Sequence, residues 1–358
     1  MGSAARPKYP MRRLGLVLVA VIAGYGRLAA RIGAPAPRPA MLARPAVLAV
    51  ADDVGISSIA AAGGRVYFGG ARNVARPADA GAGPPTEARG VIRRVLVAGG
   101  PVQELWSGPG GVAAVAPTPG GIYFLTYDYA WRRGALMHLA AGHPDAETLA
   151  TWHSHGSVHS LAVQGDVAYW THSAGASSSV LRSVAATNDR SSVTTTLAEG
   201  GDIGGAGDLC VSGRNVYWIS GRRALYRMSV AETKPAVIFE APHLSALAAD
   251  PGGNVLYLGV SDGANAAPSR LVRFEVGSRR VATIATTDQH ILATVASVDA
   301  IYFTTGAGSQ APVDVLRVLR GGGAVTTVAD GQTPPVALAL DGDRLLWTAG
   351  TRVLTAPR

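Results

Sequence analysis

The chain has 358 residues, of which 16% are charged, 48% are hydrophobic and 45 are glycine. This balance favours strands joined by glycine turns over a helical repeat, and it excludes a globally disordered chain. The net charge of +8 arises within residues 1–44, which hold eight basic and no acidic residues, so residues 45–358 are formally neutral. Because nucleic acids require a concentrated basic face, we expect no nucleic-acid partner.

Residues 1–30 have the pattern of an export signal. Arg12 and Arg13 precede twelve mostly apolar residues at 14–25, and small residues follow. A basic start, a short apolar stretch and a small-residue exit predict a signal peptide. Twelve helical residues rise only about 18 Å, short of the ~30 Å hydrocarbon core of a membrane. A short uncleaved N-terminal anchor is the alternative, because two further arginines, Arg27 and Arg31, lie where cleavage is expected.

Either Met1 or Met11 fits as the true start of this segment. A Pro/Ala-rich linker is predicted at 31–43. We therefore expect an exported protein that is periplasmic, on the cell surface or extracellular. The membrane is expected as a partner only through the N-terminal segment, if that segment is not cleaved.

One short phrase returns along residues 44–358, as in "GGRVYFGG" (63–70) and "GRNVYWIS" (213–220). Its aligned positions are Tyr67, Tyr123, Tyr169, Tyr217, Tyr257, Tyr302 and Leu346. Their mean spacing is about 46 residues, the period of a four-stranded propeller blade. An apolar run precedes each phrase, a third run follows it, and a fourth run follows in all repeats but the last. We predict an all-β fold, a seven-bladed β-propeller with four-stranded blades.

The last repeat ends at Arg358 without a fourth run, whereas "PAVLAVADD" (45–53) has the fourth-run pattern ahead of the first repeat. We therefore expect the N-terminal strand 45–53 to pair in the last blade and close the ring, which removes open sheet edges. The protein is expected to be a monomer.

A basic residue recurs in the third run and is interpreted as part of the blade itself, with its stem packed and its head at the surface. The column assigned from the sequence contains Arg93, His138, Arg182, Arg227, Arg273, Arg317 and Thr355. Cys210, the only cysteine, lies in a strand-like run and is also interpreted as structural.

The segments "SLAVQGDVAYWTHSAGASSSVLRSV" (160–184) and "PPVALALDGDRLLWTAGTRVL" (334–354) resemble the YWTD repeats of LDL-receptor class B propellers. The resemblance implies a propeller and a role in protein binding. The chain looks like a bacterial-style, secreted, seven-bladed variant, whereas that family is six-bladed. His172, Ser220 and Ala349 replace the aspartate that closes the family's signature, so no ligand-binding residue carries over.

The segment "WHSHGSVH" (152–159) is the most unusual polar stretch of the chain. If the strands of a blade are lettered A to D, the B–C loops and the D–A links share one face of the ring. The segments 126–134, 152–159 and 171–179 are then expected to be neighbours. The predicted ligand-binding residues are Tyr127, Tyr129, Trp131, Trp152, His155, His159 and His172.

We interpret this face as a binding surface for a protein or glycan, because tyrosine and tryptophan supply contact area there. The alternative is a metal-dependent lyase or hydrolase, with zinc or copper held by the nearby imidazoles. Its candidate ligands are His153, His155, His159 and His172. Their spacing matches no specific zinc signature, and a polar loop without a ligand is a third interpretation. No catalytic motif is present, so no catalytic residue is assigned and no cofactor is expected.

Overall fold

The computed structural model describes residues 45–75, 86–128, 133–153, 158–173, 179–185, 193–200, 208–229, 232, 234–263, 268–307, 311–334 and 336–358. Over these ranges all regular elements are β-strands. No helix in this part of the chain is long and apolar enough to span a membrane. The predictions for the signal or anchor at 1–30 and the linker at 31–43 fall outside the described residues.

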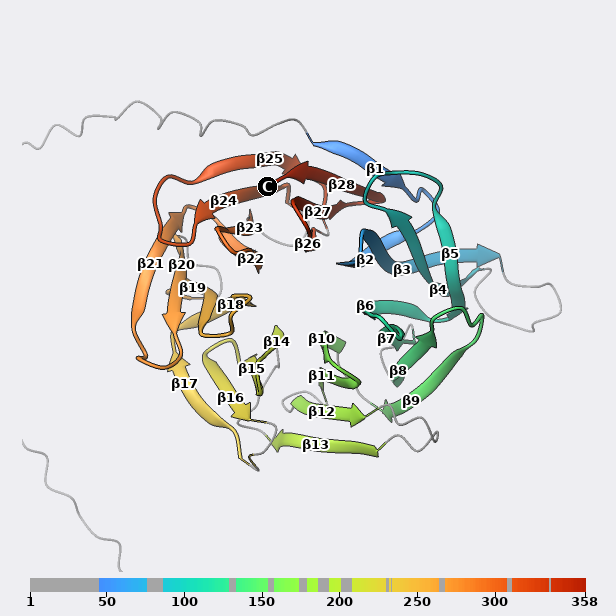
Figure 1. Ribbon diagram of the computed structural model, residues 1–358, viewed down its shortest axis with the longest axis horizontal. Helices are drawn as coiled ribbons and strands as arrows, with labels where there is room; N and C mark the ends of the chain where they lie inside the picture. Colours follow the sequence, from blue (N-terminus) through green and yellow to red (C-terminus); the bar gives the residue numbers. More distant parts are fainter. Residues whose placement is uncertain are drawn as a thin grey trace, which may run out of the picture. The chain divides into compact units, whose positions relative to one another are not determined.

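The described strands form seven four-stranded sheets, which lie as blades around a ring (Figure 1). Blade 1 contains β2 (Gly55–Ala62), β3 (Arg65–Ala75), β4 (Thr86–Leu96) and β5 (Gln103–Pro109). Blade 2 contains β6 (Gly111–Thr118), β7 (Gly121–Tyr127), β8 (Arg133–Ala140) and β9 (Ala146–His153). Blade 3 contains β10 (Val158–Gln164), β11 (Val167–Ser173), β12 (Ser179–Ala185) and β13 (Val193–Gly200). Blade 4 contains β14 (Leu209–Ser212), β15 (Asn215–Ser220), β16 (Ala224–Ser229) and β17 (Ala236–Glu240).

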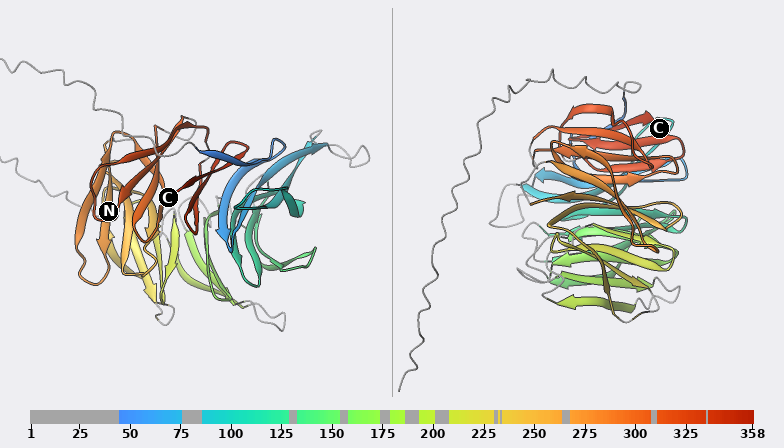
Figure 2. Two further views of the ribbon diagram at one scale, coloured as in Figure 1. Left: turned by 45° about the horizontal axis from the view of Figure 1, so that its top comes forward. Right: turned by 90° about the vertical axis from the view of Figure 1, so that its left-hand side faces the viewer.

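The remaining blades follow the same antiparallel order. Blade 5 contains β18 (His243–Ala249), β19 (Val255–Ser261), β20 (Ser269–Glu275) and β21 (Val281–Thr287). Blade 6 contains β22 (His290–Ala296), β23 (Ala300–Gly306), β24 (Val313–Leu319) and β25 (Thr326–Gln332). Blade 7 contains β26 (Leu338–Asp341), β27 (Arg344–Ala349), β28 (Arg352–Pro357) and β1 (Ala46–Val50). The first strand of each blade is the innermost, and Figure 2 shows the blades from the side.

Blade 7 combines strands from distant parts of the chain, because β1 pairs antiparallel with β28. The predicted closing strand over 45–53 is too long: β1 ends at Val50. Beyond it the Ala51 amide donates to the Thr351 carbonyl (2.9 Å), and Asp52 and Asp53 form a turn. The turn is required because the chain must pass here from the outermost strand of blade 7 to the innermost strand of blade 1, and aspartate is a favoured turn residue.

The core lies between neighbouring blades. The repeat tyrosine faces the following blade: Tyr217 of blade 4 packs with Leu247 and Leu258 of blade 5. The next residue faces the preceding blade, as Phe68 of blade 1 packs with Leu346 of blade 7. This alternation follows from the period of two along a strand. Each buried aromatic side chain contributes on the order of 2 kcal/mol, so the blades are held to one another mainly by apolar packing.

The strand register corrects the column of basic residues predicted for the third run. Tyr217, Tyr257 and Tyr302 pair with Arg227, Arg273 and Arg317 as expected. In blade 1, however, Tyr67 pairs with Arg94, and in blade 3 Tyr169 pairs with Ser183. Arg93 and Arg182 were therefore assigned to the column wrongly by one residue. A shift of one residue moves a side chain to the other face of its sheet.

Arg93 consequently faces the junction between blades 7 and 1 and not blade 2. Its guanidinium donates to both carboxylate oxygens of Asp53, at 2.7 and 2.6 Å, and to Glu104. Arg72 also donates twice to Glu104, at 3.1 Å. The hydrogen bond from Arg93 is the main reason that the pKa of Asp53 lies below its ordinary value. This charge network, Asp53, Arg72, Arg93 and Glu104, ties the turn after β1 to blade 1.

Candidate functional site

The B–C/D–A face of blade 2 carries the described part of the predicted site. Tyr127 ends β7, and Trp152 and His153 end β9. Tyr129, Trp131 and His155 lie outside the described residues, and the side chain of His159 is not described although its backbone lies in β10. The roles assigned to these four side chains stay predictions.

Trp152 is placed at the contact between blades 2 and 3. Its ring stacks on that of His172, with centroids 5.1 Å apart and an interplanar angle of 20°, and it lies 5.7 Å from Trp170. The indole packs closely over Gly134, where an added Cβ would lie 2.4 Å from it. Only 5% of Trp152 is exposed. The structure therefore brings two predicted residues, Trp152 and His172, together as packing partners.

The imidazoles proposed as metal ligands differ in exposure. His172 is 1% exposed beneath Trp152, whereas His153 is exposed opposite Arg133 on β8. Within the described ranges, no three His, Cys, Asp or Glu side chains gather closely enough to hold a metal ion. His155 lies outside these ranges, so the metal hypothesis remains a prediction. Stacking against an indole is an ordinary packing role for a buried histidine.

A cavity of about 470 Å³ lies beside these residues. It is bordered by the link between blades 1 and 2 and by the facing ends of β7, β8 and β9. The lining residues are Pro109, Gly110, Thr126, Tyr127, Asp128, Arg133, Gly134, Ala135, Thr151, Trp152 and His153. We call this cavity the blade 2 depression. Its lining mixes an aromatic ring, a carboxylate and basic groups, a combination suited to recognition.

Glycines in the link shape the depression. Gly110 has a φ of +83°, and an added Cβ would lie 2.1 Å from the Tyr127 carbonyl oxygen. At Gly111 an added Cβ would lie 2.5 Å from the Tyr127 ring, which rests over this glycine half-buried. The Asp128 amide donates to the Arg133 carbonyl oxygen (3.0 Å) and closes the base of the neighbouring loop. Only glycine permits this close approach of the link to Tyr127.

Sequence reasoning missed Arg133 and the link at 109–111 as parts of this site. The consecutive residues Pro109, Gly110 and Gly111 were the available signal, because such a run marks a turn with unusual backbone angles. Without the register of β8 against β9, nothing in the sequence placed Arg133 opposite His153.

Comparison with known proteins supports the fold alone. No family model matches the chain, and no curated protein matches it. A chain from the crystal structure of the mitotic checkpoint complex is similar, with 13% identity, coverage of 97% of this chain and 99% of that chain, and a TM-score of 0.63. The β-propeller domain of the trilobed protease from Pyrococcus furiosus has 12% identity, coverage of 85% and 95%, and a TM-score of 0.58.

A third similar structure, the acylaminoacyl peptidase of Pyrococcus horikoshii, has 10% identity and a TM-score of 0.58; the match covers 84% of this chain and 50% of the peptidase. At such identities the likeness establishes a β-propeller and nothing about ligands. The trilobed protease domain is described as having an open velcro topology. In contrast, β1 pairs with β28 in the present chain.

Proposed function

We propose that this protein is an exported β-propeller that serves as an interaction module and recognises a protein partner on its B–C/D–A face. The observation that carries the proposal is the blade 2 depression, with Tyr127 at its wall and Asp128, Arg133 and His153 at its rim. Tyrosine and arginine side chains beside a pocket often anchor protein interfaces, whereas lysine and glutamate are depleted there. The rigid ring supplies a fixed platform for such a surface.

Protein recognition is favoured over metal-dependent catalysis because His172 and Trp152 pack against each other. Participation of His172 in a metal site would require the stack to open. A glycan is the competing ligand class, since aromatic rings also stack on sugars. The similar chain in the mitotic checkpoint complex belongs to a multiprotein assembly, which is in keeping with a binding role for this fold. The likeness to the peptidase extends over only half of that enzyme.

Site-specific photocrosslinking tests this proposal. A benzophenone amino acid replaces Tyr127 in one variant and Val298 in a control. Val298 is 66% exposed in the turn between β22 and β23, on the opposite face of the ring. After irradiation in the producing cells, we expect a discrete protein adduct from position 127 that is missing from position 298. Identical adducts from both positions, or none from position 127, would refute the proposal.

Export and relationship to YWTD propellers are further parts of the proposal. The pattern of residues 1–30 supports export, and the "YWT" and "LWT" segments, which form the buried strands β11 and β27, support the relationship. N-terminal sequencing of the protein from cell fractions tests export. A chain that begins near residue 30 outside the cytoplasm is expected, and an intact start at Met1 or Met11 in the cytoplasm would contradict it. Light scattering is expected to show a monomer.

A further inference from the structure

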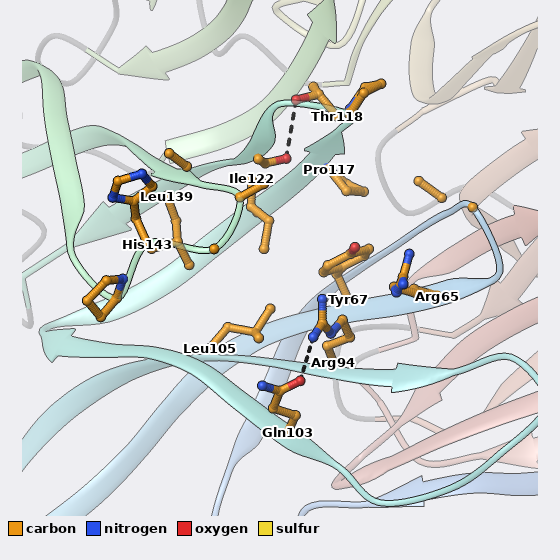
Figure 3. A pocket seen from close by; sticks show the side chains of 18 of the residues that line it. Arg65, Tyr67, Arg94, Gln103, Leu105, Pro117, Thr118, Ile122, Leu139 and His143 are labelled. Atoms are coloured by element: carbon orange, nitrogen blue, oxygen red, sulfur yellow. Dashed lines mark hydrogen bonds between the residues drawn. The ribbon is translucent and has the colours of Figure 1, made fainter.

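A second and larger cavity, of about 800 Å³, lies between blades 1 and 2 at the opposite face, where the A–B turns and C–D loops meet. Its volume is within the range of roughly 300–1,000 Å³ that is typical of small-molecule sites. Figure 3 shows Arg65, Tyr67 and Arg94 on one side, Leu139 and His143 on the other, and Leu105 and Ile122 between them. We call it the inter-blade cavity.

The repeat offers a comparison for this cavity, because an arginine bridges the two blades at the same junction of blades 5 and 6. There Arg320 of blade 6 reaches across to blade 5. Its Nε donates to the Tyr257 hydroxyl and its Nη2 to the Asp250 carboxylate, both at 2.8 Å. Tyr257 is the repeat tyrosine of blade 5, as Tyr67 is of blade 1. One arginine thus links these two blades.

The matching positions in blades 1 and 2 lack the closing groups. The Arg320 amide donates to the Asp299 carbonyl oxygen, and the Ala141 amide makes the same bond to Gly120, so Ala141 occupies the position of Arg320. Counting along the inner hairpins, Ala62 occupies the position of Asp250. Both alanines line the inter-blade cavity. Two alanines of this cavity thus stand where blades 5 and 6 have an arginine and its aspartate partner.

A different replacement changes the charge of the site. Arg273 of blade 5 donates to Glu275 at 2.6 Å. Its counterpart Arg94 has leucine, Leu96, at the equivalent place and is hydrogen-bonded to the side-chain oxygen of Gln103. Among the ion pairs of the described residues, neither Arg94 nor the nearby Arg65 has a carboxylate partner.

Glu104 also borders the cavity, but its carboxylate is bound by Arg93 and Arg72 in the charge network of blade 1. The two cavity arginines are therefore not neutralised by it. Apolar side chains supply the rest of the wall, chiefly Leu105, Ile122 and Leu139. Positive charge at one side and apolar surface at the other define the chemistry of the site.

We propose that the inter-blade cavity binds a small amphipathic anion, with its carboxylate or phosphate at Arg65 and Arg94 and its apolar body against Leu105, Ile122 and Leu139. The anion takes the place that protein carboxylates hold at the junction of blades 5 and 6. Guanidinium groups bind carboxylates and phosphates through charge-assisted, often bidentate, hydrogen bonds. This site is separate from the blade 2 depression and does not depend on the proposed function.

Fluorine NMR with defined probes tests the site on the full chain. The probes are 4-(trifluoromethyl)benzoate and 4-(trifluoromethyl)phenyl phosphate, with 4-(trifluoromethyl)benzyl alcohol as the uncharged analogue. We expect one or both anions to bind in the submillimolar range and more weakly at high salt, and the alcohol to bind at least about 10-fold more weakly. The stronger of the two anions distinguishes a carboxylate ligand from a phosphate ligand.

Variants locate the binding. Arg94→Ala is expected to weaken anion binding by about 10-fold or more, the usual loss for a charge-assisted hydrogen bond. Arg273→Ala, at the equivalent position of blade 5, is the matched control and should leave binding unchanged. The double variant A62D/A141R restores the closing pair found between blades 5 and 6, and we expect it to abolish binding while the chain stays folded.

The double variant also decides the question if Arg94→Ala fails to fold. Absence of binding by the wild-type chain at 5 mM probe would overturn the proposal. Equal binding of the alcohol would overturn it as well, because the site would then not select for charge. Full binding by a folded A62D/A141R chain would show that the anion sits elsewhere.

Discussion

Arg320 is the side chain whose removal best tests how neighbouring blades are held together by polar contacts. It joins blade 6 to blade 5 through Tyr257 and Asp250, each at 2.8 Å. Its side chain is 29% exposed and that of Asp250 is 9% exposed, so the pair is partly shielded from water. We expect Arg320→Ala to lower the free energy of unfolding substantially more than the loss of a surface ion pair.

The magnitude follows from the bonds that remain. A hydrogen bond to a charged group contributes about 1.5–3 kcal/mol, and Arg320 makes two with well-shielded partners. Asp250 keeps the amide donors of Asn254 and Val255, at 2.9 and 3.0 Å, so its carboxylate is not left unpaired. Since the guanidinium is partly solvated, we expect a loss of about 2–3 kcal/mol, below the 3–5 kcal/mol typical when a fully buried pair is broken.

Urea unfolding followed by tryptophan fluorescence measures this loss. Arg317→Ala is the control, because Arg317 lies 3.7 Å from Asp299, whose carboxylate is 52% exposed, and its loss should cost at most about 1 kcal/mol. A double-mutant cycle with Asp250→Ala should give a coupling of at least about 1 kcal/mol. A loss from Arg320→Ala no greater than the control, together with zero coupling, would refute the argument.

Acid should weaken the same contact. Burial alone raises the pKa of Asp250, but the amide of Val255 and the guanidinium of Arg320 outweigh burial and place the pKa below its ordinary value. A lowered pKa means that the stabilisation is present above the ordinary pKa of about 4 and is lost as the pH falls through the folded-state pKa. The difference between wild type and Arg320→Ala should therefore shrink at pH 2–3.

Three further predictions concern other sites. Burial raises the pKa of Asp208 to about 6, so the free energy of unfolding of the wild type should decrease as the pH rises from about 4 through 6. Asp208→Asn should remove about 1–2 kcal/mol of that decrease. Equal pH profiles of the two proteins in urea unfolding would contradict this. Arg93→Ala should cost about 1 kcal/mol by releasing the partly exposed Asp53, and an unchanged urea midpoint would show that the network contributes nothing. Elemental mass spectrometry of the full chain should find less than about 0.1 zinc or copper per chain. About one metal per chain, lost in a His153/His155/His159 triple alanine variant, would instead establish the metal site.

The blades were predictable because each one repeats similar signals: an apolar inner strand, a turn that contains glycine, aspartate or asparagine, and an aromatic strand. The turn residue Gly213, with a φ of +58°, and the buried Trp218 show why the signals recur, since most of the hairpins turn at a glycine with positive φ and the junctions bury aromatic side chains. Register was less predictable. Because Arg93 and Arg94 are adjacent, the sequence pattern allows either one to pair with Tyr67. The pairing of β3 with β4 shows that Arg94 does so and therefore faces blade 2.

The candidate sites were less predictable than the fold. Loop order placed Tyr127, Trp152 and His172 on one face, and the structure places Trp152 against His172. Burial was not foreseen, because it depends on Gly134 allowing the indole to fold over the strand. The inter-blade cavity was missed altogether. Its lining includes Ala62 and Ala141, which stand where blades 5 and 6 carry aspartate and arginine, and an absent side chain leaves no motif.

The pairing of β1 with β28 has a consequence for the order of events during synthesis. β1 leaves the ribosome before all other described strands, whereas its partner, Arg352–Pro357, is made about 300 residues later. At about 5–20 residues per second, β1 waits roughly 15–60 s for its partner. Val47 and Val50, about half exposed even in the finished ring, are in that interval part of an unpaired hydrophobic strand. The ring therefore closes only if the last blade is completed before another chain or a chaperone binds β1.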